Sequence, residues 1–210
     1  MNPRPLRLQG GAALAATMAL VAGCAAPGAF APAPPTARAV ACPTSQPPAL
    51  AAGETRTVEI RTSKGSITIK VEGSLSPIAA GNFVALAACH FYDGIVFHRV
   101  VPGFVIQGGD PKGDGTGGPG YTIDDEPVTT TYHRGTVAMA RTKQPHSQGS
   151  QFFIVLADGA ASSLAIANTY AIFGEVTTGM NVVDAIAAAA ADAELPSHPV
   201  AMDSVSVTTP

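Results

Sequence analysis

The sequence of 210 residues has no tryptophan, few charged side chains and only three cysteines. Charged residues make up 13% of the chain and the formal net charge is −3, so there is no basic excess for binding nucleic acid or an acidic membrane surface. We therefore expect no nucleic-acid partner. Glycine and proline are abundant instead, with 22 and 18 residues, and the length suits one domain with additional segments.

Acidic residues are also missing from the N-terminal quarter of the chain. No aspartate or glutamate precedes Glu54, whereas Arg4 and Arg7 lie close to the start. An apolar run over residues 10–23 follows these arginines, and it is too short for a comfortable membrane-spanning helix. A basic start followed by a short apolar run is typical of an export signal, so we predict that residues 1–23 are a signal peptide.

The apolar run ends in Val21, Ala22, Gly23 and Cys24. This order resembles the bacterial lipoprotein box, in which small residues fit the signal peptidase and the cysteine thiol takes the lipid before cleavage. The resemblance implies a diacylglyceryl group on Cys24, with fatty acids such as palmitate, and stable anchoring in the lipid bilayer takes at least two such chains. We therefore expect an exported protein on the outer face of the cell membrane or its periplasmic side. The alternative is an ordinary secretory signal in which Cys24 is incidental.

Residues 24–53 are rich in alanine and proline and lack helix or strand periodicity. The prolines of this segment include Pro32, Pro34, Pro35, Pro43, Pro47 and Pro48. We interpret the segment as a semi-extended linker that holds a domain away from the membrane. A disordered tail without a spacing role is the alternative.

Lipidation of Cys24 leaves Cys42 and Cys89 as the remaining cysteines. In an oxidising, exported setting these two residues could form a disulfide that ties the end of the linker to the domain. A buried, free Cys89 is the alternative, because sequence spacing alone does not define disulfide geometry.

The domain expected over residues 54–210 contains about eight short β-rich stretches and two stretches with helical spacing. The strands are expected at residues 57–61, 66–71, 95–100, 104–107, 136–140, 151–156, 170–176 and 203–208. One helix is expected to run from Pro77 to near His90 with Ser76 as its N-cap, and the other to cover residues 179–190. Because the helices do not alternate with the strands, the pattern predicts a mainly β fold, a closed antiparallel barrel capped by two helices.

Two loops have compositions that suggest ligand sites. Residues 108–120 are rich in glycine, but no Gly-Lys-Ser/Thr motif and no helix follows them, so positive-φ turns explain the glycines better than a phosphate does. Asp124, Asp125 and Glu126 form an acidic cluster without the ordered spacing of metal ligands, and we expect them in a solvated loop. No metal site is predicted.

Arg99 and Gln107 interrupt an otherwise apolar stretch over residues 97–110 that predicts two strands joined by a Pro-Gly turn. A cation and an amide in such a run either point to water or serve a site. The motifs around them are Phe97-His98-Arg99-Val100, Pro102-Gly103-Phe104 and Gln107-Gly108-Gly109-Asp110. They resemble the signature of the cyclophilin peptidyl-prolyl isomerases.

Other motifs of the same family follow in the same order, so the resemblance covers residues 55–208. They are Gly115-Thr116-Gly117-Gly118, Met139-Ala140, Gly149-Ser150-Gln151-Phe152-Phe153-Ile154 and Phe173-Gly174. The resemblance implies an eight-stranded barrel capped by two helices, with the active groove on its outer face. It also implies an enzyme, a peptidyl-prolyl cis-trans isomerase that accelerates rotation about X-Pro bonds of exported polypeptides and assists their folding.

The resemblance implies roles for individual residues as well. Arg99 is expected to be catalytic with Gln107 beside it, and His98 is expected to point to the other face of the strand. The residues expected to bind substrate are Phe104, Val105, Ala140, Arg141, Gln151, Phe153, Leu164 and Tyr170. Arg141 is expected to contribute its backbone. Rotation about an amide needs no proton transfer, so we expect no cofactor or metal. The expected partners are proline-containing polypeptides, and the expected state is a monomer.

Two departures from the family pattern affect these expectations. The chain is slightly longer between Met139 and Gln151, which makes the position of the Arg141 contact uncertain. A bulky aromatic residue common before the pocket leucine is replaced by Ser163 or a neighbour, which puts tight cyclosporin binding in doubt. One alternative function is a non-catalytic chaperone or surface adhesin that binds proline-containing segments. A ligand-binding barrel of the lipocalin type is disfavoured by the small, packed interior residues.

Overall fold

Alternating apolar residues form the first hairpin of the domain. Strand β1 (Thr55–Thr62) and strand β2 (Gly65–Glu72) pair in antiparallel fashion, and Val58 and Ile60 face the same buried side as their cross-strand partners Ile69 and Ile67. These four side chains are fully buried, and the two strands confirm those predicted at residues 57–61 and 66–71. The structure is a computed structural model that describes residues 40–190 and 194–208. The predicted signal peptide and Cys24 lie outside these residues.

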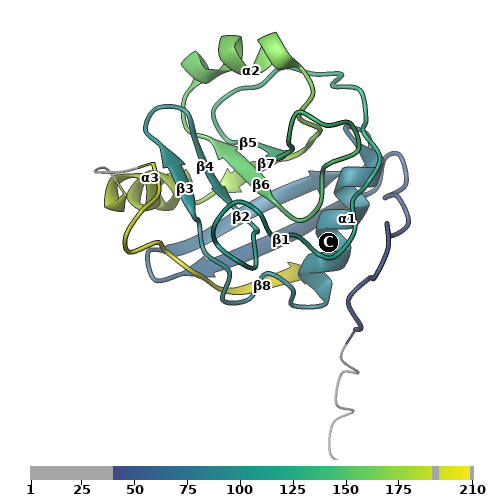
Figure 1. Ribbon diagram of the computed structural model, residues 1–210, viewed down its shortest axis with the longest axis horizontal. Helices are drawn as coiled ribbons and strands as arrows, with labels where there is room; N and C mark the ends of the chain where they lie inside the picture. Colours follow the sequence, from purple (N-terminus) through teal and green to yellow (C-terminus); the bar gives the residue numbers. More distant parts are fainter. Residues whose placement is uncertain (1–39, 191–193, 209–210) are drawn as a thin grey trace, which may run out of the picture. The chain divides into compact units, whose positions relative to one another are not determined.

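Eight strands form one curled antiparallel sheet (Figure 1). The later strands are β3 (Arg99–Val101), β4 (Val105–Gly108), β5 (Thr136–Met139), β6 (Phe152–Val155), β7 (Ile172–Thr178) and β8 (Met202–Thr208). The strand order is β3-β4-β6-β5-β7-β2-β1-β8, so β3 and β8 are the outermost strands. The prediction of a mainly β, antiparallel fold is confirmed as an eight-stranded half-barrel. A single bridge, between Val96 and Ala201, links the segments that precede these two strands.

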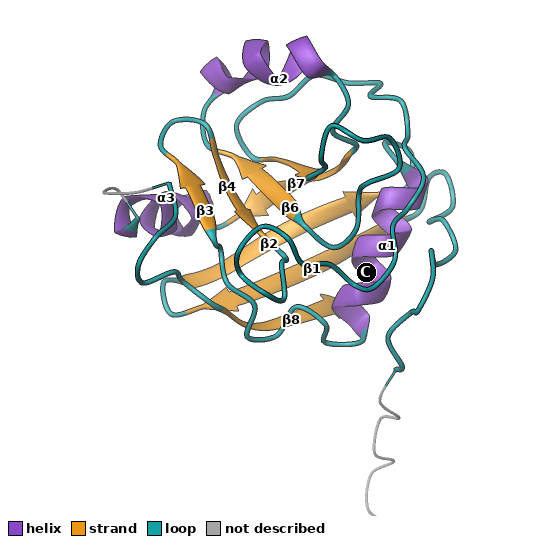
Figure 2. Ribbon diagram, viewed as in Figure 1, coloured by secondary structure: helices purple, strands orange, loops and turns teal. Residues whose placement is uncertain are grey.

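Three α-helices accompany the sheet within the described residues, where the sequence predicted two (Figure 2). Helices α1 (Pro77–Ala88) and α3 (Met180–Ala189) correspond to the two predictions. Helix α2 (Ala161–Ala167), which follows a short 3₁₀ turn at Asp158–Ala160, was missed. It is seven residues long and buries only Leu164, so it offers no helical periodicity to detect. None of the helices within the described ranges is long and apolar enough to cross a membrane.

The start of helix α1 is capped by a distant carboxylate. Ser76 is the N-cap residue, as predicted, but its hydroxyl makes no capping hydrogen bond. Instead the two carboxylate oxygens of Glu126 accept hydrogen bonds from the backbone N–H groups of Ile78 (2.9 Å) and Ala79 (2.8 Å). A carboxylate suits this position, because the first N–H groups of a helix lack partners and carry partial positive charge. Glu126 is therefore a structural residue rather than part of a solvated loop.

The chain before β1 packs on helix α1. Cys42 and Cys89 form a disulfide with a Cα–Cα distance of 5.1 Å, so of the two alternatives that the sequence left open the pairing is the one observed. Leu50 is buried and donates its backbone N–H to the carbonyl of Pro77 (2.9 Å). The carbonyl of Pro48 lies so close to Gly81 that a Cβ atom there would be 2.2 Å from it, which explains a glycine within the helix. The described end of the predicted linker thus packs against the domain.

The two faces of the sheet bury two separate hydrophobic clusters. The larger cluster contains the fully buried Phe152 and Ile154, and helices α1 and α3 contribute to it. The smaller cluster, which we call the outer cluster, lies on the opposite face. Its buried residues are Val105, Tyr132, Ala138, Phe153, Val155, Ala160, Leu164 and Ile172. Strand alternation produces this division, because successive side chains point to opposite faces.

Candidate active site

A row of side chains crosses four neighbouring strands on the face of the outer cluster. Arg99 on β3 pairs with Gln107 on β4, Gln107 pairs with Phe153 on β6, and Phe153 pairs with Ala138 on β5. Directly opposed residues point to the same face of a sheet. The strand register therefore places the guanidinium of Arg99, the amide of Gln107 and the ring of Phe153 side by side.

The polar end of this row is a chain of hydrogen bonds. Nη1 of Arg99 donates to Oε1 of Gln107 (3.4 Å), and Nε2 of Gln107 donates to Oε1 of Gln151 (2.9 Å). Nε2 of Gln151 in turn donates to the carbonyls of Gly115 (3.0 Å) and Gly117 (2.9 Å). The glycine-rich loop thus orients Gln151, and through it Gln107, so that the amide oxygen of Gln107 faces the arginine. Sequence analysis predicted these three side chains as site residues but not the part played by the loop carbonyls.

A second partner of Arg99 was not predicted. Nε of Arg99 donates to Oε1 of Glu194 at 2.5 Å, and the backbone N–H of Val100 donates to the carbonyl of Glu194 at 2.9 Å. Glu194 lies in the irregular connection between α3 and β8, 95 residues away from Arg99 in the sequence. No sequence motif marks this glutamate, so only the tertiary structure could identify it.

The apolar end of the row is the outer cluster. Phe153, Val105 and Leu164 are buried in it, and Phe104, Ala140 and Tyr170 pack against it while remaining partly exposed. The rings of Phe153 and Tyr170 meet edge to face, with centroids 5.4 Å apart. The structure therefore brings together all six predicted apolar substrate-binding residues.

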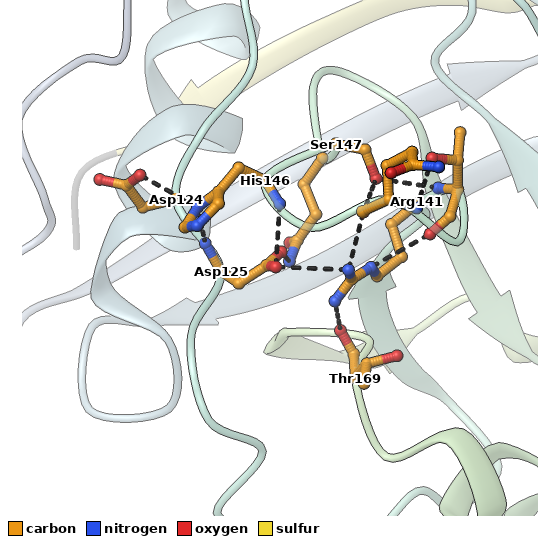
Figure 3. Close-up of polar contacts among 9 residues, drawn as sticks. Asp124, Asp125, Arg141, His146, Ser147 and Thr169 are labelled. Carbon is orange, nitrogen blue, oxygen red and sulfur yellow. Dashed lines mark hydrogen bonds and ion pairs between the residues drawn. The ribbon is translucent and has the colours of Figure 1, made fainter.

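The side chain of Arg141 is the centre of a network of polar contacts (Figure 3). Its guanidinium donates to the carbonyls of Thr142 (3.2 Å), Gln144 (2.8 Å) and Thr169 (3.5 Å) and pairs with the carboxylate of Asp125 at 3.3 Å. The side chain is only 11% exposed. It is thus committed to holding the loop over residues 141–147, which we call the wall loop. Within the described part of the chain, the backbone N–H and C=O of Arg141 have no hydrogen-bond partner.

Asp125 ties the wall loop to the acidic cluster. Its carboxylate accepts hydrogen bonds from the backbone N–H of His146 (2.9 Å) and from the side-chain amide of the buried Gln148 (3.0 Å). Burial acts to raise the pKa of Asp125, but these hydrogen bonds and the charge of Arg141 outweigh it and lower the pKa. The prediction that this cluster is a solvated loop is therefore also wrong for Asp125.

An open cleft lies beside the row. Its volume is about 750 Å³, and its lining includes Gln107, Gln151, the glycine-rich loop and the start of the wall loop. The cleft therefore adjoins the polar part of the row. An extended peptide has room to lie across the site.

His98 is excluded from the site although it is the neighbour of Arg99. It is 3% exposed, which agrees with the expectation that it points away. Burial lowers the pKa of His98 and the nearby charge of Asp110 opposes this change, with a net decrease. A neutral, buried imidazole is suited to packing rather than to exchanging protons with a substrate.

The site thus combines a held guanidinium, an amide pair and an apolar pocket beside an open cleft. Within residues 40–190 and 194–208, no group of three or more His, Cys, Asp or Glu residues is placed to hold a metal ion. A cationic donor next to an apolar pocket can stabilise electron density that develops on a polar atom of a ligand whose apolar part lies in the pocket.

Comparisons with known proteins give this arrangement a family. Residues 57–207 match the family described as "Cyclophilin type peptidyl-prolyl cis-trans isomerase/CLD". The probable peptidyl-prolyl cis-trans isomerase A of Mycobacterium leprae is 38% identical over 72% of this chain and 92% of its own. A peptidyl-prolyl cis-trans isomerase of Acinetobacter baylyi is 42% identical over 62% and 71%, respectively.

Solved structures agree with the sequence comparisons. A cyclophilin type peptidyl-prolyl cis-trans isomerase of Cryptosporidium parvum superposes with a TM-score of 0.67 at 30% identity, over 75% of this chain and 99% of its own. The same protein in the presence of the dipeptide Ala-Pro gives a TM-score of 0.66 at 31% identity, over 73% and 99%. The chain therefore belongs to the cyclophilin-type peptidyl-prolyl cis-trans isomerases.

Proposed function

We propose that Arg99 is the catalytic donor for rotation about X-Pro bonds. An amide resists rotation with a barrier of about 18–20 kcal/mol, because the nitrogen lone pair is delocalised into the carbonyl. In the twisted transition state the proline nitrogen becomes pyramidal and accepts a hydrogen bond. A fixed donor aimed at this nitrogen stabilises the transition state more than the planar ground state, and arginine stays charged at all physiological pH values.

The observation that carries this proposal is the row formed by Arg99, Gln107 and Phe153. It sets the guanidinium beside an apolar pocket, so a proline ring held by Phe104, Phe153 and Leu164 has its nitrogen near the donor. Gln107 acts as the acceptor that holds the guanidinium in place. Val105 and Tyr170 complete the pocket, and the relative solved in the presence of Ala-Pro supports a proline-containing peptide as ligand.

The residues before and after the proline lie, in this proposal, along the cleft. The unpaired backbone groups of Arg141 bind the peptide main chain, with Ala140 and Gln151 beside them. Because every site residue comes from one chain, we propose that the enzyme acts as a monomer. We also propose that the sheet closes into a barrel, which the Val96–Ala201 bridge and the hydrogen bond from Phe97 N to Val200 O (2.9 Å) support.

We further propose that the enzyme works outside the cytoplasm, anchored through a lipid on Cys24, and assists the folding of exported polypeptides. The Cys42–Cys89 disulfide supports an oxidising compartment, since stable disulfides are rare where thiols are kept reduced. Labelling of cells with radioactive palmitate tests the anchor. Label in the wild-type protein that is lost in Cys24→Ser supports it, and an unlabelled wild-type protein contradicts it.

The catalytic proposal is tested with an X-Pro peptide and the protein from residue 25 onward, which retains the disulfide. We expect Arg99→Ala to lower kcat/KM by about 10²- to 10³-fold, as for the loss of one transition-state donor. Circular dichroism serves as the control for folding. Unchanged turnover in a folded Arg99→Ala protein would refute the role of Arg99.

A further inference from the structure

The guanidinium of Arg99 is held from two sides. Gln107 accepts a hydrogen bond from Nη1, and the carboxylate of Glu194 accepts one from Nε. The remaining terminal nitrogen, Nη2, has no acceptor within the described part of the chain. Because the guanidinium is planar and rigid, fixing two of its nitrogens also fixes the direction in which the third one points.

Glu194 is itself fixed relative to the strand that carries Arg99. The hydrogen bond from Val100 N–H to the carbonyl of Glu194 attaches this residue to the edge of β3. Further on, Val96 pairs with Ala201 and the backbone N–H of Phe97 donates to the carbonyl of Val200 (2.9 Å), so residues after Glu194 also lie along the chain before β3, in a shifted register. The backbone of Glu194 is therefore aligned with β3, next to the residue whose side chain its carboxylate contacts.

The ion pair is too exposed to contribute much to stability. The side chain of Arg99 is 33% exposed and that of Glu194 is 59% exposed. Exposed ion pairs typically contribute little to folding, because water screens the charges and two long side chains lose freedom. The same contact can still restrict the rotamers of Arg99, which matters to a reaction that depends on where a donor points.

We propose that Glu194 is a positioning residue for Arg99. Its carboxylate holds Nε and, together with Gln107, leaves Nη2 directed at the substrate. This inference rests on the proposed catalytic role of Arg99. It assigns to Glu194, in the α3–β8 connection, the task of orienting the donor before substrate arrives.

The test compares Glu194→Ala, Glu194→Gln and wild type, with Asp184→Asn as the matched control. Asp184 on α3 pairs with Arg134 at 2.7 Å, and the two side chains are 51% and 38% exposed, close to the values of Glu194 and Arg99. Nuclear magnetic resonance exchange measurements on an X-Pro peptide separate the rate of rotation from the affinity. The Nε–H resonance of Arg99 reports directly whether the guanidinium is held.

We expect Glu194→Ala to lower the rotation rate about tenfold with little change in peptide affinity, and Glu194→Gln, which keeps an acceptor but loses the charge, to lower it less. The Nε–H resonance of Arg99 should broaden through faster exchange with water in Glu194→Ala and stay sharp in Asp184→Asn. Unfolding midpoints of all variants should remain close to that of wild type.

A rotation rate in Glu194→Ala equal to that of wild type overturns the inference. A rate above that of wild type overturns it too, because it would mean that the carboxylate inhibits the arginine. An unchanged Nε–H resonance overturns it as well. Arg99→Ala, measured in parallel, separates the two proposals. If Arg99→Ala loses activity while Glu194→Ala keeps it, only the role of Glu194 is refuted. Full activity of Arg99→Ala refutes the catalytic role on which the inference rests.

Discussion

Phe152 and Phe153 are adjacent in strand β6 and belong to opposite faces of the sheet. The ring of Phe152 lies 5.1 Å from that of Phe83 and 5.7 Å from that of Tyr92, within the larger cluster. The ring of Phe153 contacts Tyr170 in the outer cluster, beside Gln107. One residue of offset along the strand thus separates a core side chain from a pocket side chain.

This division predicts different effects for the same substitution at the two positions. Phe152→Ala should lower the free energy of unfolding by about 3–5 kcal/mol, because it leaves a cavity among aromatic rings. Phe153→Ala should cost less stability and mainly raise KM, since the proposed proline pocket loses its wall. Urea unfolding and isomerisation kinetics on both variants check this. Equal losses of stability with unchanged KM in Phe153→Ala would contradict the assignment.

Glu126 should stabilise helix α1, although it lies 47 residues after Ala79, from whose N–H it accepts a hydrogen bond. Removal of a capping acceptor typically costs about 0.5–2 kcal/mol, so we expect Glu126→Ala to lower the free energy of unfolding by about that amount. Asp124→Ala is the control, because Asp124 is exposed and makes no contact with the helix N-terminus through its side chain. Thermal unfolding distinguishes the two variants. A control as destabilised as Glu126→Ala would indicate a general effect of charge instead.

The disulfide should be a large contributor to stability. It joins residues 47 apart and encloses β1, β2 and α1, and the loop-closure entropy of such a loop corresponds to about 4 kcal/mol. We expect dithiothreitol to shift the urea midpoint of the protein to lower concentration. The double variant Cys42→Ser/Cys89→Ser should be destabilised to a similar degree and insensitive to the reductant. A wild-type urea midpoint that is unchanged by the reductant, although the disulfide is fully reduced, would contradict this expectation.

The wall loop should govern peptide affinity rather than rotation. Arg141→Met keeps an apolar stem but removes the guanidinium that joins Thr142, Gln144, Thr169 and Asp125. The peptide must then order the loop on binding, so we expect KM to rise about threefold to tenfold with kcat little changed. Lys143→Met, an exposed position in the same loop, is the control and should behave like wild type. A fall in kcat without a change in KM would argue against this role.

The buried His98 should make stability depend on pH below neutrality. Its pKa in the folded protein is below the ordinary value of 6.5, so the unfolded chain binds the proton more readily. The stabilising contribution is therefore complete above pH 6.5 and is lost as the pH falls through the folded-state pKa. Urea unfolding at several pH values across this range should show that the free energy of unfolding depends less steeply on pH in His98→Gln than in wild type. His198→Gln, at an exposed position, provides the control, and equal slopes in all three proteins would contradict the prediction.

Much of the fold followed from local sequence patterns. Alternation in β1 and β2 and the apolar face of α3 identify these elements through their periodicity, and the Ser-Pro pair marks the start of α1. Helix α2 and the capping role of Glu126 did not follow. A helix of seven residues has too little periodicity to detect, and a cap supplied by another segment leaves no trace beside the helix it serves.

For the site, the sequence by itself determined which side chains are available: Arg99, Gln107, Gln151 and Phe153 stand in motifs that identify the family. The tertiary structure alone decided what holds them. The strand register brings Arg99 beside Phe153, and the α3–β8 connection brings Glu194 to the arginine. The physical reason is that orientation of a donor depends on contacts between segments up to 95 residues apart, and such contacts are set by packing rather than by any local pattern.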